Sequence, residues 1–88
     1  MTAKMAVVAH GGAGSGLARQ TNLQVAVDVA SKLLLSGASA VEAAVEACVI
    51  LEDDPVFNAG TGGVFRIDGS VLLDASIQTS DGSLGFVI

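Results

Sequence analysis

The chain has 88 residues, a net charge of −5 and a composition that is 51% hydrophobic but only 3% aromatic. This length allows one domain at most. Its many Ala and Val residues bury less area each than Leu or Phe, as in part of a larger core. The four basic residues are scattered, which argues against binding to nucleic acids or anionic membranes. The single cysteine, Cys48, excludes an internal disulfide and a metal site built from cysteines alone.

The N-terminal segment contains a short apolar run, residues 5–9, that ends in His-Gly-Gly-Ala-Gly at residues 10–14. The run is too short for a signal peptide or a membrane span, and the lone cysteine fits a reducing compartment. We therefore expect a soluble, cytoplasmic protein. We also predict a buried strand over residues 5–9, entering a flexible glycine loop that extends to about Arg19.

Two amphipathic helices are predicted after this loop, with Ser36-Gly37 as the stop between them. Their start signals have capping-box spacing and consist of Thr21 with Gln24, and of Ser39 with Glu42. The first apolar stripe is Val25, Ala26, Val29, Ala30, Leu33 and Leu34, and the second is Val41, Ala44, Val45, Cys48 and Val49. We expect both stripes to be buried, with Cys48 as a small core side chain.

A glycine-rich loop and an antiparallel meander are predicted after the second helix. Pro55 should end that helix by restricting Asp54, and residues 58–63 hold too many glycines for regular structure. Asp68-Gly69, between strands at 64–67 and 71–77, is a strong hairpin signal, and a turn at 80–82 introduces a last strand over 84–88. The predicted class is α+β. The bare hydrophobic edge of that last strand indicates the front part of a longer protein.

The glycine run that begins at Gly11 has some features of a phosphate-binding loop, because glycines let backbone N–H groups approach an anion. It lacks the remaining residues of the dinucleotide and Walker patterns, so nucleotide binding is a remote alternative. His10 is the only histidine, which excludes a multi-histidine metal site. A lone histidine at a strand end is more often structural, and we expect its ring to hold the glycine loop.

Oxygen-bearing groups gather at the end of the second helix. Glu52, Asp53 and Asp54 lie near the negative end of the helix dipole, which indicates a cation or basic groups nearby, although a solvated helix end is an alternative. Exposed main-chain carbonyls followed by a glycine loop could circle a small hard cation.

Two further polar residues, Asn58 and Asp74, have two possible roles each. The amide of Asn58, beside Phe57, can brace its own turn or point at a ligand, and the pattern favours bracing. Asp74, in a predicted strand, can be a structural hydrogen-bond acceptor or a site acid. Nothing in its neighbourhood decides between the two.

Four motifs, in this order and spacing, resemble the plant-type asparaginase and isoaspartyl-peptidase family of N-terminal-nucleophile hydrolases. They are residues 10–14 (His-Gly-Gly-Ala-Gly), 39–43 (Ser-Ala-Val-Glu-Ala), 51–60 (Leu-Glu-Asp-Asp-Pro-Val-Phe-Asn-Ala-Gly) and 73–77 (Leu-Asp-Ala-Ser-Ile). The resemblance spans nearly the whole chain, and residues 51–77 are its most specific part. It implies that residues 1–88 are an N-terminal fragment of the α subunit of such an enzyme, one incomplete part of an αββα sandwich.

The resemblance also implies an activity and partners. In this family a precursor cleaves itself before a threonine, which then serves as nucleophile and, through its own amine, as base. The implied substrates are L-asparagine and β-aspartyl (isoaspartyl) dipeptides, hydrolysed to L-aspartate plus ammonia or an amino acid. The implied partners are the rest of the α subunit and the β subunit, in a dimer of αβ units, without an organic cofactor.

The implied nucleophile is absent from this chain, which we expect to be inactive by itself. The family's nucleophile lies in a Gly-Thr-Val-Gly segment, a context that none of the four threonines has: Thr2, Thr21, Thr61 and Thr79. Supporting residues do match: Asn58 corresponds to the asparagine beside the nucleophile, and Gly11, next to His10, to a mobile glycine tied to self-cleavage. The main-chain oxygens of a sodium-binding loop match at six positions: Leu51, Glu52, Asp54, Phe57, Ala59 and Thr61.

One departure from the family pattern concerns residues 78–87. Relatives continue here with Met-Asp-Gly and a Gly-Ala-Val strand, whereas this chain has a longer hairpin and Phe86 in place of a small residue. Substrate preference is therefore open, and a threonine aspartase-type protease, which also has an Asn-Ala-Gly-Thr-Gly loop, is an alternative. A non-catalytic, truncated paralogue that binds another chain through residues 84–88 is the alternative outside the enzymes.

Overall fold

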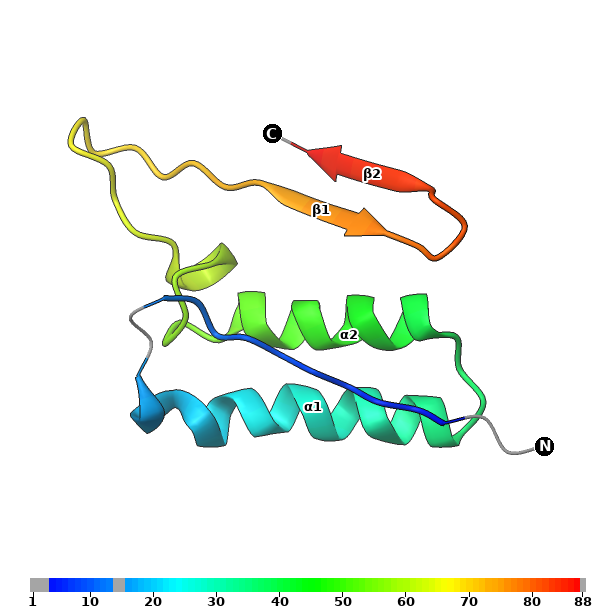
Figure 1. Ribbon diagram of the computed structural model, residues 1–88. Coiled ribbons are helices and arrows are strands. Elements are labelled where there is room, and N and C mark those ends of the chain that lie inside the picture. Colours follow the sequence, from blue (N-terminus) through cyan, green and yellow to red (C-terminus); the bar gives the residue numbers. More distant parts are fainter. Residues whose placement is uncertain (1–3, 14–15, 88) are drawn as a thin grey trace.

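The computed structural model describes residues 4–13 and 16–87. Its elements are the 3-10 turn η1 (Leu17–Arg19), helices α1 (Gln20–Leu35) and α2 (Ala40–Asp53), the 3-10 turn η2 (Gly60–Gly62), and strands β1 (Ala75–Gln78) and β2 (Leu84–Val87). Figure 1 shows α1 and α2 side by side, with the β1–β2 ribbon beyond α2. The described chain is thus α+β, as predicted, with two helices and a two-stranded antiparallel sheet.

The two helices pack through small side chains. The buried residues of their interface are Ala26, Ala30, Ala43 and Ala47, and the partly buried residues around them are Val7, Leu33, Leu34, Ile50 and Leu51. Alanines on both sides of the contact let the two helix axes approach closely. Burial of Ala26 and Ala30 was predicted, whereas Val25, in the same predicted stripe, is 52% exposed.

The stripe predicted for α2 is not the face that packs against α1. Val41, Val45 and Val49 are 40%, 43% and 44% exposed, and Ala44 and Cys48 are exposed too. The prediction that Cys48 is a core side chain is therefore wrong. Periodicity finds the more apolar face of a helix, but the contact with α1 uses the adjacent face of alanines, where the backbones come closest.

The start of α2 and the end of α1 follow their sequence signals. Ser39 Oγ accepts a hydrogen bond from Glu42 N at 3.1 Å, which confirms one half of the predicted capping box. At the end of α1, Gly37 adopts φ 100° and Ala38 N donates to Leu33 O at 3.0 Å. With Gly37 N donating to Leu34 O at 3.1 Å, this is a Schellman motif, and it satisfies two carbonyls of the last turn.

The start signal predicted for α1 is wrong. The helix begins at Gln20, directly after η1, so Thr21 lies inside the first turn and makes no cap. Gln24 Nε2 instead donates to Asp28 Oδ1 at 2.8 Å. A preceding 3-10 turn leads the backbone into the helix, so no side-chain cap is needed here.

Only the last hairpin of the predicted meander forms a strand ladder. β1 and β2 pair antiparallel with Ser76 opposite Phe86 and Ile77 opposite Gly85. The turn at Asp68-Gly69 does form, with Gly69 N donating to Arg66 O at 2.9 Å, but residues 64–67 and 71–74 are not strands. The local turn signal was therefore right and the strands around it were not. Position 88, the predicted end of the last strand, lies outside the described residues.

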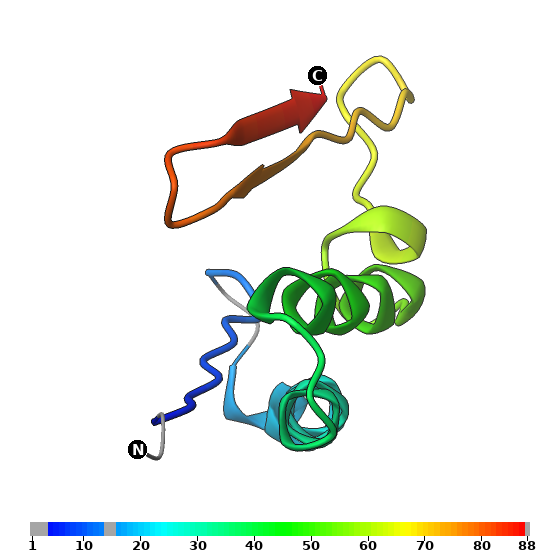
Figure 2. The same cartoon turned by 90° about the vertical axis from the view of Figure 1, so that its right-hand side faces the viewer.

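Residues 5–9 are not the strand that their composition predicts. An extended segment becomes a strand only by pairing with a neighbouring backbone, and in the described part of the chain only β1 and β2 pair. The segment runs along the helix pair (Figures 1 and 2), and Val7 packs against the helical core. Residues 14 and 15 of the predicted glycine loop lie outside the described residues.

Candidate functional site

A tight turn, residues 54–57, connects α2 to the loop that carries most of the predicted site. α2 ends at Asp53, and Asp54 leaves the helical conformation before Pro55, as predicted. Phe57 N donates to the main-chain O of Asp54 at 3.2 Å, and Val56 N donates to Asp54 Oδ1 at 3.1 Å. Asp at the first position and Pro at the second are residues that favour such a turn.

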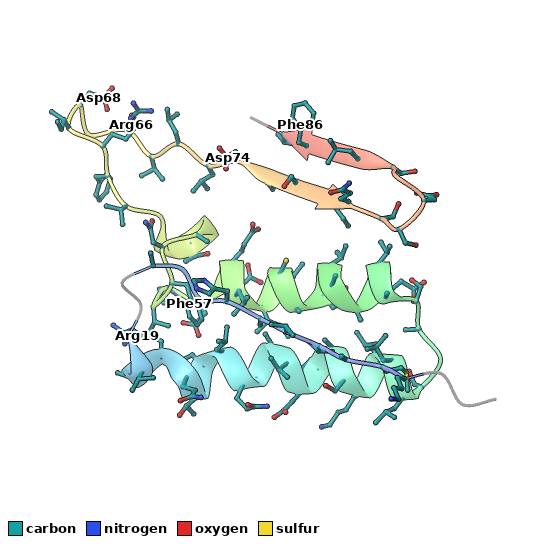
Figure 3. All side chains as sticks on the ribbon, viewed as in Figure 1. Arg19, Phe57, Arg66, Asp68, Asp74 and Phe86 are labelled. Carbon is teal, nitrogen blue, oxygen red and sulfur yellow. The ribbon has the colours of Figure 1, made fainter. Side chains whose placement is uncertain are left out.

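Phe57 anchors this turn to the start of α1. Its side chain is 3% exposed and lies between the end of α2 and the beginning of α1 (Figure 3). It lines a cavity of about 230 Å³ together with Leu17 and Leu23. Burying an aromatic ring stabilises a fold by about 2–3 kcal/mol, so this contact fixes the loop in place.

Two glycines let the backbone of η2 pass close to main-chain oxygens of the loop. A Cβ on Gly60 would lie 2.6 Å from Glu52 O, and one on Gly62 would lie 1.9 Å from Phe57 O. Real Cβ atoms do not approach oxygen so closely, so both positions require glycine. The carbonyl oxygens of Glu52 and Phe57, two of the six predicted ligands, therefore lie against η2.

The other four predicted ligand positions lie in the same part of the chain. Leu51 is in the last turn of α2, and Thr61 is in η2. The main-chain oxygens of Asp54 and Ala59 accept hydrogen bonds from Phe57 N at 3.2 Å and from Gly62 N at 3.0 Å. Since a carbonyl oxygen has two lone pairs, each keeps acceptor capacity beyond its hydrogen bond.

Asn58 braces the loop, which is one of the two roles that its position allowed. Its Oδ1 accepts a hydrogen bond from Val64 N at 3.1 Å, six residues further along the chain. The bond fixes the plane of the amide, whose NH₂ group still has two donors. Asn58 is therefore a positioned polar group as well as a structural one.

A cavity of about 580 Å³ brings Asn58 together with two carboxylates, Glu52 and Asp74. Its apolar wall consists mainly of Val64, Leu72, Leu73 and Val87. Figure 3 shows Asp74 just before β1, on the segment that leads from the loop into that strand. A few convergent polar groups on an apolar wall are the usual design of a site for a small polar ligand.

His10 holds the glycine loop, as predicted. Its Nδ1 accepts a hydrogen bond from Gly12 N at 2.9 Å. His10 and Gly11 line the smaller cavity with Phe57 and Arg19, whereas Asn58 lines the larger one. The structure therefore places the three predicted supporting residues on two cavities, one lined by Phe57 and the other by its neighbour Asn58.

A contact that sequence reasoning missed connects α1 to the turn. Asn22 Nδ2 donates to Asp54 Oδ2 at 3.0 Å, and the pair is partly buried. An asparagine in the first turn of a helix is ordinary, and 32 residues separate it from its partner. No local pattern could have identified it.

The carboxyl groups with shifted pKa values belong to turns outside both cavities. The hydroxyl of Ser70 lowers the pKa of Asp68, and the hydroxyl of Thr79 lowers the pKa of Asp81 to about 2. In the described ranges, no group of three or more His, Cys, Asp and Glu side chains could hold a metal ion.

Comparison with known proteins identifies the family. The sequence model of the family described as asparaginase matches residues 3–85, which include all four motifs. The chain belongs to the asparaginase family. Within the described residues, no helix of this family member is long and apolar enough to span a bilayer.

Curated members of the asparaginase family are similar to this chain over most of its length. The isoaspartyl peptidase/L-asparaginase of Nostoc sp. is 47% identical over 87 residues, which cover 90% of this chain and 26% of the relative. The plant-type L-asparaginase of Pyrococcus abyssi is 39% identical, covering 84% and 26%. The isoaspartyl peptidase/L-asparaginase of Bos taurus is 42% identical, covering 82% and 25%. The chain spans about a quarter of the length of these relatives.

Proposed function

We propose that these residues form part of an amidohydrolase that cleaves L-asparagine and β-aspartyl dipeptides to L-aspartate plus ammonia or an amino acid. The observation that carries the proposal is the family match over residues 3–85, with relatives named isoaspartyl peptidase/L-asparaginase. The attacking group would be a threonine that self-cleavage frees elsewhere in the protein. The remaining α-subunit residues and the β subunit would complete an αββα sandwich, within a dimer of αβ units.

Asn58 is the residue of this chain that we assign next to the reaction. Its hydrogen bond from Val64 N holds the amide plane, so its NH₂ donors need no reorganisation when charge develops on a nearby oxygen. Glu52 and Asp74 line the same cavity. His10 would act more remotely, by fixing the loop that contains Gly11 through its bond from Gly12 N.

We assign a sodium ion to the main-chain oxygens of the loop around η2. Glycines at 60 and 62 leave the space beside Glu52 O and Phe57 O that any Cβ would fill. Carbonyl oxygens are ligands that small hard cations accept. The proposed ligands are the main-chain oxygens of Leu51, Glu52, Asp54, Phe57, Ala59 and Thr61. A bound ion would supply a fixed positive charge that orders this loop, without taking part in bond cleavage.

The test uses the protein as its gene encodes it. We expect release of aspartate from L-asparagine and from a β-aspartyl dipeptide, and a fall of about 100-fold in kcat for Asn58→Ala. Gln24→Ala, on the exposed side of α1, is the matched control and should keep full activity. A protein that hydrolyses neither L-asparagine nor the β-aspartyl dipeptide would contradict the proposal.

Assaying the 88-residue chain alone tests whether the nucleophile lies outside these residues. We expect it to release no aspartate above a buffer control, and turnover by it would place the nucleophile within these residues. Binding to the remaining chain without any hydrolysis would instead support a non-catalytic module.

A further inference from the structure

We propose that Asn22 is a positioning residue that holds the carbonyl loop, residues 51–61, in register with α1. The geometry rests on one contact between distant parts of the chain. Asn22 Nδ2 donates to Asp54 Oδ2 at 3.0 Å, across 32 residues and in a partly buried setting. Asp54 is the first residue after α2, where the chain leaves the helix and enters the loop.

The chemistry of the pair fixes its orientation. A carboxylate only accepts hydrogen bonds, so Asn22 must present its NH₂ group to Asp54. Asp54 uses both carboxylate oxygens, since Oδ1 accepts from Val56 N at 3.1 Å while Oδ2 accepts from Asn22. The same side chain therefore braces the turn and attaches it to α1.

Two attachments to one helix define a position better than one. Phe57 is buried near Leu17 of η1 and Leu23 of α1, and an apolar contact of this kind holds a segment without fixing its rotation. The directional bond from Asn22 supplies the missing constraint. Three residues after Phe57 comes Gly60, where the backbone passes so close to Glu52 O that a Cβ would lie 2.6 Å away. A small rotation of the turn would disturb this close approach of Gly60 to Glu52 O.

Loss of the Asn22–Asp54 bond should first loosen the loop and, through the loop, lower catalysis. Without Asn22, the turn should open more often, exposing the N–H groups of Val56 and Phe57 that now donate to Asp54. Weaker sodium binding and lower hydrolysis would follow, and these two effects rest on the proposed function. The opening of the loop does not depend on it.

Asn22→Asp is the sharpest variant, because it sets two carboxylates against each other without harming the helix. An acid in the first turn of α1 interacts favourably with the helix dipole, so any loss comes from the contact with Asp54. The exchanged pair, N22D with D54N, restores one donor and one acceptor. In that pair the amide oxygen at position 54 can still accept from Val56 N, while the amide NH₂ donates to the carboxylate at position 22. The matched control is Gln24→Ala, which removes an amide–carboxylate bond that lies within α1.

The measurement is hydrogen exchange of the Val56 and Phe57 amides, together with the rise in melting temperature when NaCl replaces choline chloride. For N22D we expect exchange to be about tenfold faster or more, as for loss of a hydrogen bond to a charged group, and the sodium effect to shrink. In the double variant N22D/D54N, at least half of the increase in the logarithm of the hydrogen-exchange rate should be reversed. Q24A should exchange at the wild-type rate.

Unchanged exchange in N22D, or no recovery in the exchanged pair, would overturn the positioning role. Faster exchange with rescue, but no sodium effect in any variant including the wild type, would keep that role and remove the proposed sodium site instead. The two proposals therefore fail separately.

Discussion

The helix pair with its carbonyl loop and the arm of residues 64–87 differ in how they are stabilised. The helices share a buried core of alanines, and Phe57 attaches the loop to them. No Cα of β1 or β2 lies within 8 Å of one in α1 or α2, and every strand residue is exposed. Figure 2 shows the β ribbon standing apart from the stacked helices.

This difference shows which part of the chain carries its own tertiary contacts. A helix satisfies its backbone hydrogen bonds internally and needs only one buried face, whereas a two-stranded ribbon is marginal unless a further strand or a helix covers it. Mutations in the helix pair and loop should therefore lower the free energy of unfolding strongly, and mutations in the arm weakly. Substitutions in the two regions test that division.

The largest effect is expected for Gly62→Ala in the loop. The new methyl group would lie 1.9 Å from Phe57 O and 2.6 Å from Pro55 O, both in the backbone, so the loop must shift. We expect a loss of about 3 kcal/mol in the free energy of unfolding, at the upper end of the overpacking range. Urea denaturation of the gene-encoded protein, followed by circular dichroism, measures it.

The matched control is Gly82→Ala in the turn of the β1–β2 hairpin. Gly82 has φ +89°, and a Cβ added there would have no atom within 4 Å. The substitution therefore costs conformational strain alone, about 1–2 kcal/mol. If Gly82→Ala destabilises the protein more than Gly62→Ala, the division between loop and arm is wrong.

The next effect concerns the helix contact. Ala30 is 1% exposed at the interface with α2, so Ala30→Leu should force the helices apart and cost about 2 kcal/mol. Ala44 is exposed on α2, and Ala44→Leu should change stability by less than about 0.5 kcal/mol. Equal effects of the two substitutions in urea denaturation would show that the face carrying Val41, Val45 and Val49 is buried in the whole protein.

Sequence reasoning succeeded where a few neighbouring residues decide the structure. Ser39 with Glu42 marks the start of α2, Pro55 marks its end, and the turn near residue 81 joins two strands, because each signal acts within about four residues. The same is true of the bond between His10 and Gly12. These features are set by local hydrogen bonds and steric limits.

It failed where distant contacts decide. The strand predicted at residues 5–9 has no partner strand in the described ranges, and Cys48 is exposed although its periodic pattern is apolar. The choice of the alanine face over the valine face depends on how closely α1 approaches. In the candidate site, residues 51–61 were predicted from the sequence. The bond from Asn22 to Asp54 and the presence of Asp74 and Asn58 on one cavity depend on tertiary structure.

A smaller effect on stability is expected at the helix starts, where Ser39 caps α2 and Thr21 does not cap α1. Ser39→Ala removes the acceptor for Glu42 N and should cost about 1 kcal/mol. Thr21→Ala, inside α1, removes no cap and introduces the better helix former, so stability should stay equal or rise by a few tenths of a kcal/mol. Thermal unfolding of both variants measures this. A loss of stability for Thr21→Ala as large as that for Ser39→Ala would show that Thr21 does cap α1.

The smallest effect belongs to the arm and depends on pH. The Thr79 hydroxyl and Ser83 N donate to the Asp81 carboxylate and lower its pKa from 3.8 to about 2. Because the folded pKa lies below the unfolded one, the turn is stabilised above pH 3.8, and that stabilisation is lost as the pH falls towards about 2. Asp81 is fully exposed, so only the hairpin should loosen while the helix pair remains folded.

Nuclear magnetic resonance titration of the Asp81 carboxyl carbon between about pH 1.5 and 5 follows this change, with the amide signals of β1 and β2 as reporters of pairing. Thr79→Val removes the strongest donor and should move the Asp81 pKa up towards 3.8. An unshifted Asp81 in the wild type, or a titration unaffected by Thr79→Val, would show that this turn does not hold its carboxylate. Loss of helix signals in the same pH range would show that the arm and the helix pair unfold together, which the absence of contacts between the two strands and the two helices argues against.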